Sequence, residues 1–306
     1  MWPVRVVGFS GRIPRPGGGD PYPSRSRIPD AFAPVLGASE RPGHLDRRIT
    51  DGPGGHGGLT ASRHLRESAP PVPHHVGIIM DGNGRWARAR RRSVSYGHRA
   101  GVAAIKRTMY ACEELGVKIL SVYAFSTENW RRSRREVGGL MRLFEETLQR
   151  EFDELNARGV RIVVSGRREG LSGRMQRQIT EAEEGTRLNR EGVLNVCLNY
   201  GGRAELVDAV KRLVIEGVSV DGITEEAIST RLYRPELPDP DLIIRTAAET
   251  RLSNFLLWES AYSEFYVTPT LWPDFDRAAL AEAIAEYQRR IRRFGARPAE
   301  PERAAG

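Results

Sequence analysis

The distribution of apolar and polar residues follows a regular pattern from Pro73 onward. Short apolar runs rich in β-branched residues, each ending in a turn signal, predict buried strands. Between them lie longer segments in which apolar residues recur every three or four positions, as on one face of a helix. The predicted strands cover residues 76–80, 119–125, 160–165, 194–198, 242–244 and 265–267. The predicted helices cover residues 98–115, 134–157, 171–190, 204–215 and 224–233, with a last one that Asp276 caps.

Strands that alternate with helices are typical of a sheet covered by helices on both faces. A helical connection returns the chain to the same end of the sheet, so that neighbouring strands run parallel. The sequence therefore predicts an α/β fold with a central, mostly parallel six-stranded sheet flanked by helices, in one domain over residues 73–297. The helix predicted at 134–157 carries a long apolar stripe, which ordinary core packing explains on periodicity alone.

The two ends of the chain have a different composition. Residues 1–72 are rich in Gly, Pro, Arg and Ser, and their apolar residues follow no period. Such a segment buries too little apolar surface to offset the entropy of ordering, so we predict that it is disordered. A start site placed too far upstream would also explain it. Four histidines, His56, His64, His74 and His75, match no common metal site, and we expect them to be solvated. Residues 298–306 predict a loose polar tail.

The charge balance favours anionic partners. The 306 residues include 47 Lys and Arg against 39 Asp and Glu, a formal charge of +8. Phosphorylated substrates, acidic lipids and nucleic acid all suit such a balance. Because no known nucleic-acid-binding motif is present, we expect no nucleic acid partner. Salt-dependent RNA binding by the core would revive that alternative.

The sequence also bears on the compartment. Cys112 and Cys197 lie within apolar patterns, which indicates buried thiols in a reducing environment and not a disulfide. No apolar run reaches the roughly 18 residues that a membrane-spanning helix needs. An apolar signal-peptide core is also missing before Pro14 and Pro16. We therefore expect a cytoplasmic protein that also associates with a membrane surface.

One stretch combines groups that suit phosphate chemistry. Asp81 follows the first predicted strand at once, and Gly82, Asn83, Gly84 and Arg85 come next. The glycines let the backbone approach a ligand, and a turn that opens a helix at the end of a parallel strand presents N–H groups to a phosphate. The carboxylate can hold Mg²⁺ and the guanidinium can bind a phosphate. For this pattern alone, a strand–turn–helix corner with a solvated carboxylate is the simpler interpretation.

Four longer motifs decide between the two interpretations. The chain contains HVGIIMDGNGRWA, then AFSTENWRRS, then NYGGRAEL, then LIIRTAAETRLSNFLLWESAYSEFYV. In this order they resemble the cis-prenyltransferases, the undecaprenyl diphosphate synthase family, and the likeness runs from about residue 73 to residue 295. The resemblance implies a Mg²⁺-dependent enzyme that condenses isopentenyl diphosphate with an allylic diphosphate. It also implies a homodimer, and a hydrophobic tunnel for the growing chain with a wall formed by the helix at 134–157.

The resemblance assigns catalytic and metal-binding roles to three residues. Asp81 is implied as the essential acid and a Mg²⁺ ligand, and Glu264 as a second carboxylate for the metal. Asn129 is implied in proton removal, although a neutral amide is a poor base and we expect it chiefly to orient the substrate.

Further residues are implied in substrate binding. The first motif matches the pocket for the allylic diphosphate, and Arg245, Arg251 and Ser253 match the pocket for isopentenyl diphosphate. The implied substrate-binding residues are Gly82, Asn83, Gly84, Arg85, Trp86, His98, Ser126, Thr127, Glu128, Trp130, Arg132, Arg245, Arg251, Leu252 and Ser253.

The chain departs from the family pattern at three places. Val94 stands where the family usually has an arginine, so Arg91 or Arg92 would have to replace a contact to the allylic diphosphate. Ala247-Ala248 stands where a glycine is usual, and alanine resists a positive φ, so the isopentenyl pocket could differ in shape. Ser133 replaces a usual proline. These changes leave room for reduced activity or an altered substrate.

Two alternatives within the family stay open. One is a non-catalytic or weakly active partner subunit, which would typically lack Asp81 or the Arg251-x-Ser253 segment that this chain keeps. The other is a short-chain synthase. In the family a small residue at the position of Ala124 goes with long products, so we expect a medium-to-long chain.

Overall fold

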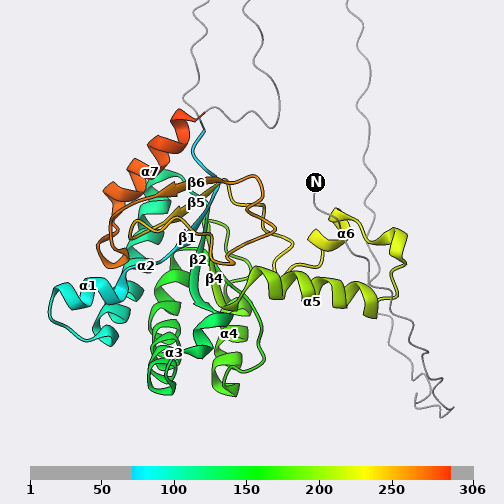
Figure 1. The fold of residues 1–306 in the computed structure, drawn as a ribbon, viewed down its shortest axis with the longest axis horizontal. Coiled ribbons are helices and arrows are strands. Elements are labelled where there is room, and N and C mark those ends of the chain that lie inside the picture. The colour runs from blue at the N-terminus through cyan, green and yellow to red at the C-terminus, as the bar shows by residue number, and fades with distance from the viewer. Residues whose placement is uncertain (1–70, 291–306) are drawn as a thin grey trace, which may run out of the picture. The chain divides into compact units, whose positions relative to one another are not determined.

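The computed structural model describes residues 71–290, and Figure 1 shows how their elements are arranged. Six strands form one sheet in the order β3-β4-β2-β1-β5-β6, and every neighbouring pair is parallel. The strands are β1 (His75–Ile79), β2 (Ile119–Ser126), β3 (Val160–Ser165), β4 (Gly192–Tyr200), β5 (Leu242–Arg245) and β6 (Glu264–Val267). The predicted six-stranded α/β fold is confirmed. The predicted tail at 298–306, and residues 1–72 apart from the last two, lie outside the described residues.

The helices largely follow the predicted periodicity. They are α1 (Asn83–Ala89), α2 (Val94–Leu115), α3 (Arg134–Ala157), α4 (Gly173–Gly185), α5 (Gly202–Ile215), α6 (Glu225–Ser229) and α7 (Arg277–Arg289). Short 3₁₀ helices cover Thr127–Arg131, Val220–Gly222 and Trp272–Asp274. The predicted cap of the last helix is confirmed, because Asp276 Oδ1 accepts the N–H of Ala279 at 3.0 Å.

Three predicted helix boundaries were wrong for local reasons. The helix predicted from residue 98 begins at Val94, because the Ser93 side chain accepts the N–H of Tyr96 and caps it earlier. The helix predicted to residue 190 ends at Gly185, where the Thr186 hydroxyl bonds the Ala182 carbonyl. The helix predicted over residues 224–233 is the single short turn of α6.

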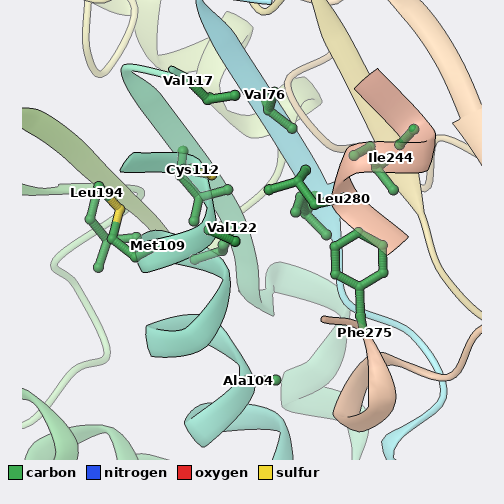
Figure 2. Close-up of a cluster of buried hydrophobic side chains, with 14 of the residues drawn as sticks. Val76, Ala104, Met109, Cys112, Val117, Val122, Leu194, Ile244, Phe275 and Leu280 are labelled. Atoms are coloured by element: carbon green, nitrogen blue, oxygen red, sulfur yellow. The ribbon is translucent and has the colours of Figure 1, made fainter. Parts of the chain in front are cut away.

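The central strand β1 is buried along its whole length. Alternate residues of a strand point to opposite faces of the sheet. Val76 and Ile78 pack on one face against α2 and α7, through residues such as Cys112 and Leu280 (Figure 2). Ile79 packs with the opposite cluster, which includes Phe255. Helices and loops on both faces thus fix the position and direction of β1.

Both cysteines are buried free thiols, as predicted. Cys112 lies in the main core, and burial raises the pKa of its thiol to about 12. Cys197 packs on the opposite face of the sheet, and burial raises the pKa of its thiol as well. Neither side chain is therefore available as a thiolate near neutral pH.

Parallel pairing brings the carboxyl ends of all strands to one edge of the sheet. The neighbours of β1 are β2 on one side and β5 on the other, so the chain order reverses at β1. In open α/β sheets, ligands bind outside the carboxyl ends of the strands at such a reversal point. The residues that follow β1, β2, β4 and β5 therefore define the place to look for a functional site. Among the described residues, no helix is both long enough and apolar enough to cross a membrane.

Candidate active site

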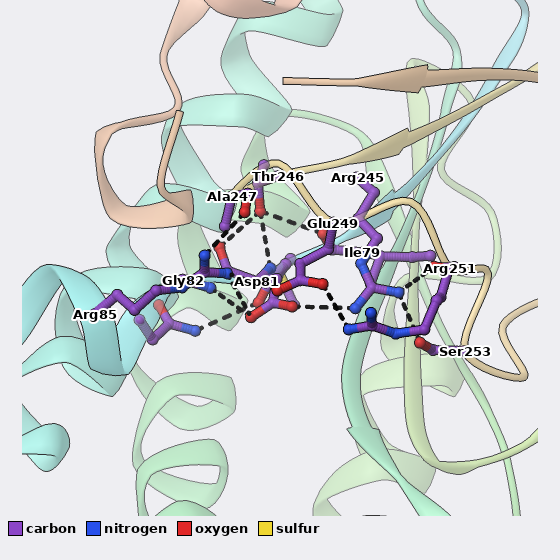
Figure 3. Close-up of polar contacts among 12 residues, drawn as sticks. Ile79, Asp81, Gly82, Arg85, Arg245, Thr246, Ala247, Glu249, Arg251 and Ser253 are labelled. Carbon is purple, nitrogen blue, oxygen red and sulfur yellow. Dashed lines mark hydrogen bonds and ion pairs between the residues drawn. The ribbon is translucent and has the colours of Figure 1, made fainter. Parts of the chain in front are cut away.

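An ion pair between the ends of β1 and β5 lies at the centre of this edge (Figure 3). The Arg245 Nη2 atom donates to Asp81 Oδ2 at 3.1 Å. The same guanidinium donates to Ser253 Oγ at 2.6 Å and to the Arg251 carbonyl. Arg245 is 5% exposed, whereas the Asp81 side chain is 37% exposed. A buried cation thus holds a carboxylate that solvent and ligands can still reach.

The turn after β1 is fixed by backbone contacts. Gly82 has a φ of 107°, a conformation that favours glycine, and its N–H donates to Asp81 Oδ1 at 2.7 Å. A side chain at Gly82 would lie 2.9 Å from Leu271 Cδ2. Thr246 Oγ1 accepts the N–H of Asp81 at 2.8 Å and lies 2.7 Å from the Asp81 carbonyl. The carboxylate is therefore positioned by the backbone on both sides of it.

A second guanidinium lies on the other side of the carboxylate. Arg85 Nη2 is 3.8 Å from Asp81 Oδ1 and 3.5 Å from Glu249 Oε1, while Nη1 donates to the Ala247 carbonyl at 3.0 Å. Glu249 also pairs with Arg251 at 2.5 Å. These exposed pairs can exchange a carboxylate for a phosphate, because both oxyanions suit the fork of an arginine.

The loop that follows β5 keeps a strained conformation. Ala247 and Ala248 have φ values of 70° and 58°, and Ser253 and Asn254 have 52° and 66°. The two alanine N–H groups donate to the carbonyls of Thr270 and Thr268, at 2.9 and 2.8 Å, which holds the loop in place. Alanine therefore adopts the conformation that it was expected to resist, at a cost of roughly 1–2 kcal/mol per residue.

A cleft of about 610 Å³ opens in front of these residues. Seven of the predicted site residues line it, namely Asp81, Ser126, Glu128, Asn129, Arg132, Arg245 and Ser253. Residues that the prediction missed also line it, among them Tyr123, Arg203, Asn254 and Leu257. A signal for Arg203 was present, because Gly201-Gly202-Arg203 follows β4 in the way that Gly82 to Arg85 follow β1.

The 3₁₀ turn after β2 orients the polar groups on one wall of the cleft. Asn129 Oδ1 accepts the N–H of Ser126 at 3.1 Å and closes a capping box. Glu128 Oε1 accepts from Asn254 Nδ2 at 3.0 Å. Partial burial favours a higher pKa for Glu128, but hydrogen bonds to its carboxylate outweigh this and lower the pKa. Glu128 is therefore an anion at neutral pH, and Asn129 has its side-chain oxygen engaged by the backbone.

Two aromatic residues predicted for the site lie outside this cleft. Trp86 donates to Asp274 Oδ1 at 2.7 Å and stacks on Tyr96, with ring centroids 5.8 Å apart. Trp130 donates to Asn199 Oδ1 at 2.7 Å, away from the cleft. Seven further predicted residues also do not line it, namely Gly82, Asn83, Gly84, Arg85, Thr127, Arg251 and Leu252.

His98 belongs to a neighbouring pocket of about 520 Å³ that Val94 also lines. Its Nε2 atom is 3.5 Å from Glu136 Oε1, and Glu136 accepts from Arg132 at 3.0 Å. Burial, followed by the charge of Arg132, lowers the pKa of His98. The two pockets are therefore linked through Arg132, which lines the main cleft.

Glu264 is the one predicted metal ligand that the fold separates from Asp81. It begins β6 in register with Leu242, which pairs with Val76 at the start of β1. Asp81 follows Val76 by five residues, or about 16 Å along a strand. Glu264 Oε2 accepts from Arg290 Nη1 at 2.8 Å. Within one chain, strand register therefore puts the two carboxylates at opposite ends of the sheet. A role for Glu264 in metal binding stays a prediction.

The remaining residues suit a metal that is shared with a substrate. No cluster of three or more His, Cys, Asp or Glu side chains suited to a metal occurs within residues 71–290. Mg²⁺ in phosphate-handling sites often takes only one or two protein carboxylates, together with water and phosphate oxygens. The accessible carboxylate of Asp81 matches that requirement.

An apolar cavity of about 320 Å³ lies beside the cleft, between the sheet and helices α2, α3 and α4. Tyr123 lines the cleft, and the next residue on β2, Ala124, lines the cavity. An apolar cavity therefore lies where the tunnel is predicted, and α3 lines it through Phe144, Leu148, Phe152 and Leu155.

Comparison with known proteins gives a consistent result. A family model described as "Putative undecaprenyl diphosphate synthase" matches residues 79–295. An isoprenyl transferase of Heliobacterium mobile is 52% identical over 237 residues, which cover 76% of this chain and 91% of that protein. A (2E,6E)-farnesyl-diphosphate-specific ditrans,polycis-undecaprenyl-diphosphate synthase of Aliivibrio fischeri is 44% identical over 73% of this chain and 89% of that protein. Among solved structures, lavandulyl diphosphate synthase from Lavandula x intermedia, in complex with dimethylallyl diphosphate, superposes with a TM-score of 0.70 at 37% identity. That match covers 73% of this chain and 98% of the other.

Proposed function

Because this prenyl-transferring enzyme belongs to the undecaprenyl diphosphate synthase family, the cis-prenyltransferases, we propose that it condenses isopentenyl diphosphate units onto an allylic diphosphate. The proposed product is a cis-polyprenyl diphosphate, and the reaction is proposed to depend on Mg²⁺. The relatives of known name support this reaction class, and the donor groups of the cleft support the substrates.

The observation that carries the proposal is the meeting of two unlike cavities on one strand. Tyr123 lines a cleft that contains carboxylates and arginines, and Ala124 lines an apolar cavity. Both residues lie near the carboxyl end of β2, so the two cavities reach the same edge of the sheet. A substrate with a diphosphate head and a hydrocarbon tail needs this combination.

The charged groups divide into two sets on either side of Asp81. We propose that Arg85 and the Gly82 turn bind the allylic diphosphate, and that Arg245 with Ser253 binds isopentenyl diphosphate. In the proposed reaction the allylic C–O bond breaks and diphosphate leaves with the electron pair. The isopentenyl double bond forms the new C–C bond, and the isopentenyl unit loses a proton to a diphosphate oxygen as a double bond re-forms. Arginines aimed at the leaving oxygens stabilise the charge that develops there.

Asp81 would hold the metal together with diphosphate oxygens. Bound Mg²⁺ would neutralise charge on the leaving diphosphate. The Arg245 guanidinium orients the Asp81 carboxylate through a hydrogen bond of 3.1 Å. Asn129, with its Oδ1 atom engaged by Ser126, orients the 3₁₀ turn, and we assign it no role as the base.

The decisive experiment is incubation of the purified protein with labelled isopentenyl diphosphate and, in turn, dimethylallyl, geranyl and farnesyl diphosphate. We expect a cis-polyprenyl product with at least one starter, loss of product on chelation of Mg²⁺, and its return when Mg²⁺ is added back. Asp81→Asn should reduce turnover at least a hundredfold, or about 3 kcal/mol of barrier, while the protein stays folded, as circular dichroism would show. Absence of product with all three starters, or turnover by Asp81→Asn within tenfold of wild type, would contradict the proposal.

We further propose a homodimer that works in the cytoplasm at a membrane surface. Val207, Val210 and Val214 form an exposed apolar stripe on α5, with 51%, 40% and 65% of their surface accessible, which supports a protein interface. A long hydrocarbon product supports membrane contact at release, because each CH₂ group gains about 0.8 kcal/mol on leaving water. Light scattering of wild type and Val210→Asp tests the homodimer. Co-sedimentation with lipid vesicles tests the membrane contact.

A further inference from the structure

The formal charge of the chain is concentrated in one segment. Residues 82–112 contain eight Lys and Arg and no Asp or Glu. Because the whole chain has 47 basic and 39 acidic residues, the other 275 residues balance at 39 of each sign. Five of the eight cations fall within residues 88–99, around the turn between α1 and α2. The proposed reaction uses only Arg85 from the whole segment, so most of this positive charge has no role in the cleft.

The turn between α1 and α2 presents its arginines in a fixed arrangement. The N–H of Arg91 donates to the Arg88 carbonyl at 3.0 Å. Arg91 has a φ of 54°, a left-handed conformation that is uncommon for a residue other than glycine. Arg88, Arg91 and Arg92 are exposed, and none of them belongs to an ion pair within residues 71–290. Three guanidinium groups are thus available to an anionic surface.

Apolar and aromatic side chains lie among these cations. Tyr96 is 41% exposed and Val94 is 37% exposed. The Tyr96 ring stacks on Trp86, and the Cζ atom of Arg92 lies 5.5 Å from the Tyr96 ring centroid. Exposed aromatic rings mixed with arginines suit the boundary between the headgroups and the hydrocarbon of a bilayer. We call the following set the α1–α2 corner: Arg88, Arg91, Arg92, Val94 and Tyr96.

The corner lies at the edge of the sheet that carries the cleft. Helix α1 begins directly after the turn that follows the carboxyl end of β1. Val94 lines the His98 pocket, and two exposed arginines of α3, Arg135 and Arg142, line it as well. Positive charge therefore continues from the corner across that pocket to α3. Figure 1 shows α1 on the side of the sheet away from α5, the helix proposed for the dimer interface.

We propose that the α1–α2 corner docks the enzyme on a bilayer that contains anionic phospholipids. The inference deepens the membrane contact proposed above and rests on it. The arginines attract anionic headgroups within about a Debye length of the surface, and Tyr96 and Val94 enter the boundary region. Docking in this way turns the cleft edge of the sheet toward the bilayer, which takes up a long hydrocarbon product on release.

The test measures how the full-length protein partitions onto phosphatidylcholine vesicles with and without phosphatidylglycerol, by co-sedimentation at low and high salt. The corner variant combines Arg88→Gln, Arg91→Gln and Arg92→Gln, which removes three charges and keeps polar side chains. A second variant, Tyr96→Ala, removes the exposed ring and keeps every charge. Binding to heparin, a soluble polyanion, is measured in parallel, and circular dichroism checks the fold of each variant.

A matched control removes the same charge from another part of the surface. It combines Arg177→Gln, Arg187→Gln and Arg190→Gln, at exposed arginines on α4 and in the loop that follows it. None of the three belongs to an ion pair in the described part of the chain. The loop leads into the start of β4, so Arg187 and Arg190 lie at the edge of the sheet opposite to the cleft.

We expect wild type to bind only the vesicles that contain phosphatidylglycerol, and to lose binding as the ionic strength rises. The corner variant should lose at least tenfold in partition coefficient, because each arginine near an anionic surface adds to the attraction. The control should bind vesicles like wild type. Tyr96→Ala should bind vesicles severalfold more weakly but bind heparin unchanged, because only a bilayer has a boundary region for the ring.

Equal vesicle binding by the corner variant and the control would overturn the role of the corner and leave the proposed membrane contact intact. A raised KM of the corner variant for geranyl diphosphate, with vesicle binding kept, would overturn it too and assign the arginines to substrate capture. Vesicle binding by Tyr96→Ala equal to wild type would show attraction to anions without docking. A wild type that binds neither kind of vesicle would overturn the membrane contact as well. Product formation is assayed without vesicles, so a failure of the proposed reaction is seen separately.

Discussion

At the scale of single residues, the site is built from groups that local rules disfavour. Ala248 holds a φ of 58° although it is not glycine, and Arg245 is a buried cation. Each is stabilised by specific partners: the Thr268 carbonyl for the first, and Asp81 with Ser253 for the second. Strain of this kind is stored where a ligand site needs a fixed geometry.

Ala248 allows a direct measure of that strain. It is exposed, so Ala248→Gly removes no buried surface. Relief of the left-handed conformation outweighs the extra freedom of glycine in the unfolded chain, and we expect stabilisation by about 0.5–1 kcal/mol in urea unfolding. Ala285→Gly, the same change at an exposed position within α7, should instead destabilise by about 1 kcal/mol. If both variants changed the free energy of unfolding in the same direction, the loop would not be strained.

A buried pair of carboxyl groups behind the cleft predicts a pH dependence of stability. Glu205 accepts from the Tyr200 hydroxyl and hydrogen-bonds Glu259, whose Oε2 atom is buried. Burial, and then the charge of Glu205, raises the pKa of Glu259 to about 8. The folded state thus holds a proton that the unfolded chain releases near the ordinary value of 4.5.

The stabilisation that the buried proton of Glu259 gives to the folded state is complete below pH 4.5. It is lost as the pH rises toward 8, and the free energy of unfolding falls by up to about 1.4 kcal/mol per pH unit. Glu259→Gln keeps the hydrogen-bonding shape without the titration. We expect wild type to lose unfolding free energy relative to this variant between pH 5 and pH 8, measured by urea unfolding at each pH. Parallel stability curves would disprove the buried proton.

At the scale of elements, the edge strand β3 shows how side chains replace a missing neighbour. Its outward N–H groups at Ile162 and Val164 donate to Thr186 Oγ1 and Glu183 Oε1, both at 2.9 Å. The Val164 carbonyl accepts from Arg234 at 2.8 Å. Covering an edge in this way removes a surface on which another strand could pair.

Thr186→Val tests that covering without a change of shape. The buried N–H of Ile162 would lose its acceptor, and we expect destabilisation by about 1–3 kcal/mol from urea midpoints. The control is Thr180→Val, on the exposed side of α4, the helix that ends just before Thr186. It should change the free energy of unfolding by less than about 0.5 kcal/mol. Two variants with the same midpoint would mean that water replaces the lost hydroxyl.

The elements themselves could be predicted from the sequence to a large extent. All six strands and the long helix α3 follow from the pattern of apolar residues. Short apolar runs indicate strands, apolar residues at every third or fourth position indicate helices, and both patterns can be recognised within a few residues of the chain. Boundaries such as Val94 were missed because a cap at Ser93 competes with the apolar pattern. Arg203 was also missed despite the Gly-Gly-Arg turn that marks it, because its place at the cleft depends on β4 lying beside β2.

At the scale of the whole molecule, the site depends on strand order and register, which periodicity does not contain. The resemblance to a family pointed to Asp81, Arg245 and Ser253 as site residues, and the fold brings them within hydrogen-bonding distance of one another. The resemblance also pointed to Glu264. This residue pairs with Leu242 and so lies at the end of the sheet opposite to Asp81. Motifs identify the residues, but only three-dimensional pairing decides which of them meet.

The joint cleft and cavity predict an effect of side-chain size at Ala124. Ala124→Leu should obstruct the cavity and shorten the product, measured by chromatography of the chains made from a common starter. Ala124→Gly enlarges the same position and should not shorten it. If the leucine variant only melts earlier, with the overpacking cost of about 1–3 kcal/mol and an unshifted product, the position serves packing alone.

The central place of β1 also has a consequence in time. Asp81 and Arg245 are 164 residues apart in the chain, so a ribosome adding about 5–20 residues per second needs roughly 10–30 s between them. During that interval β1 can pair with β2, while its other edge, apolar and hydrogen-bonding, has no partner until β5 emerges. A nascent chain of this protein is therefore most open to mispairing after most of its sheet exists, and the Asp81–Arg245 ion pair is among the last contacts it can make.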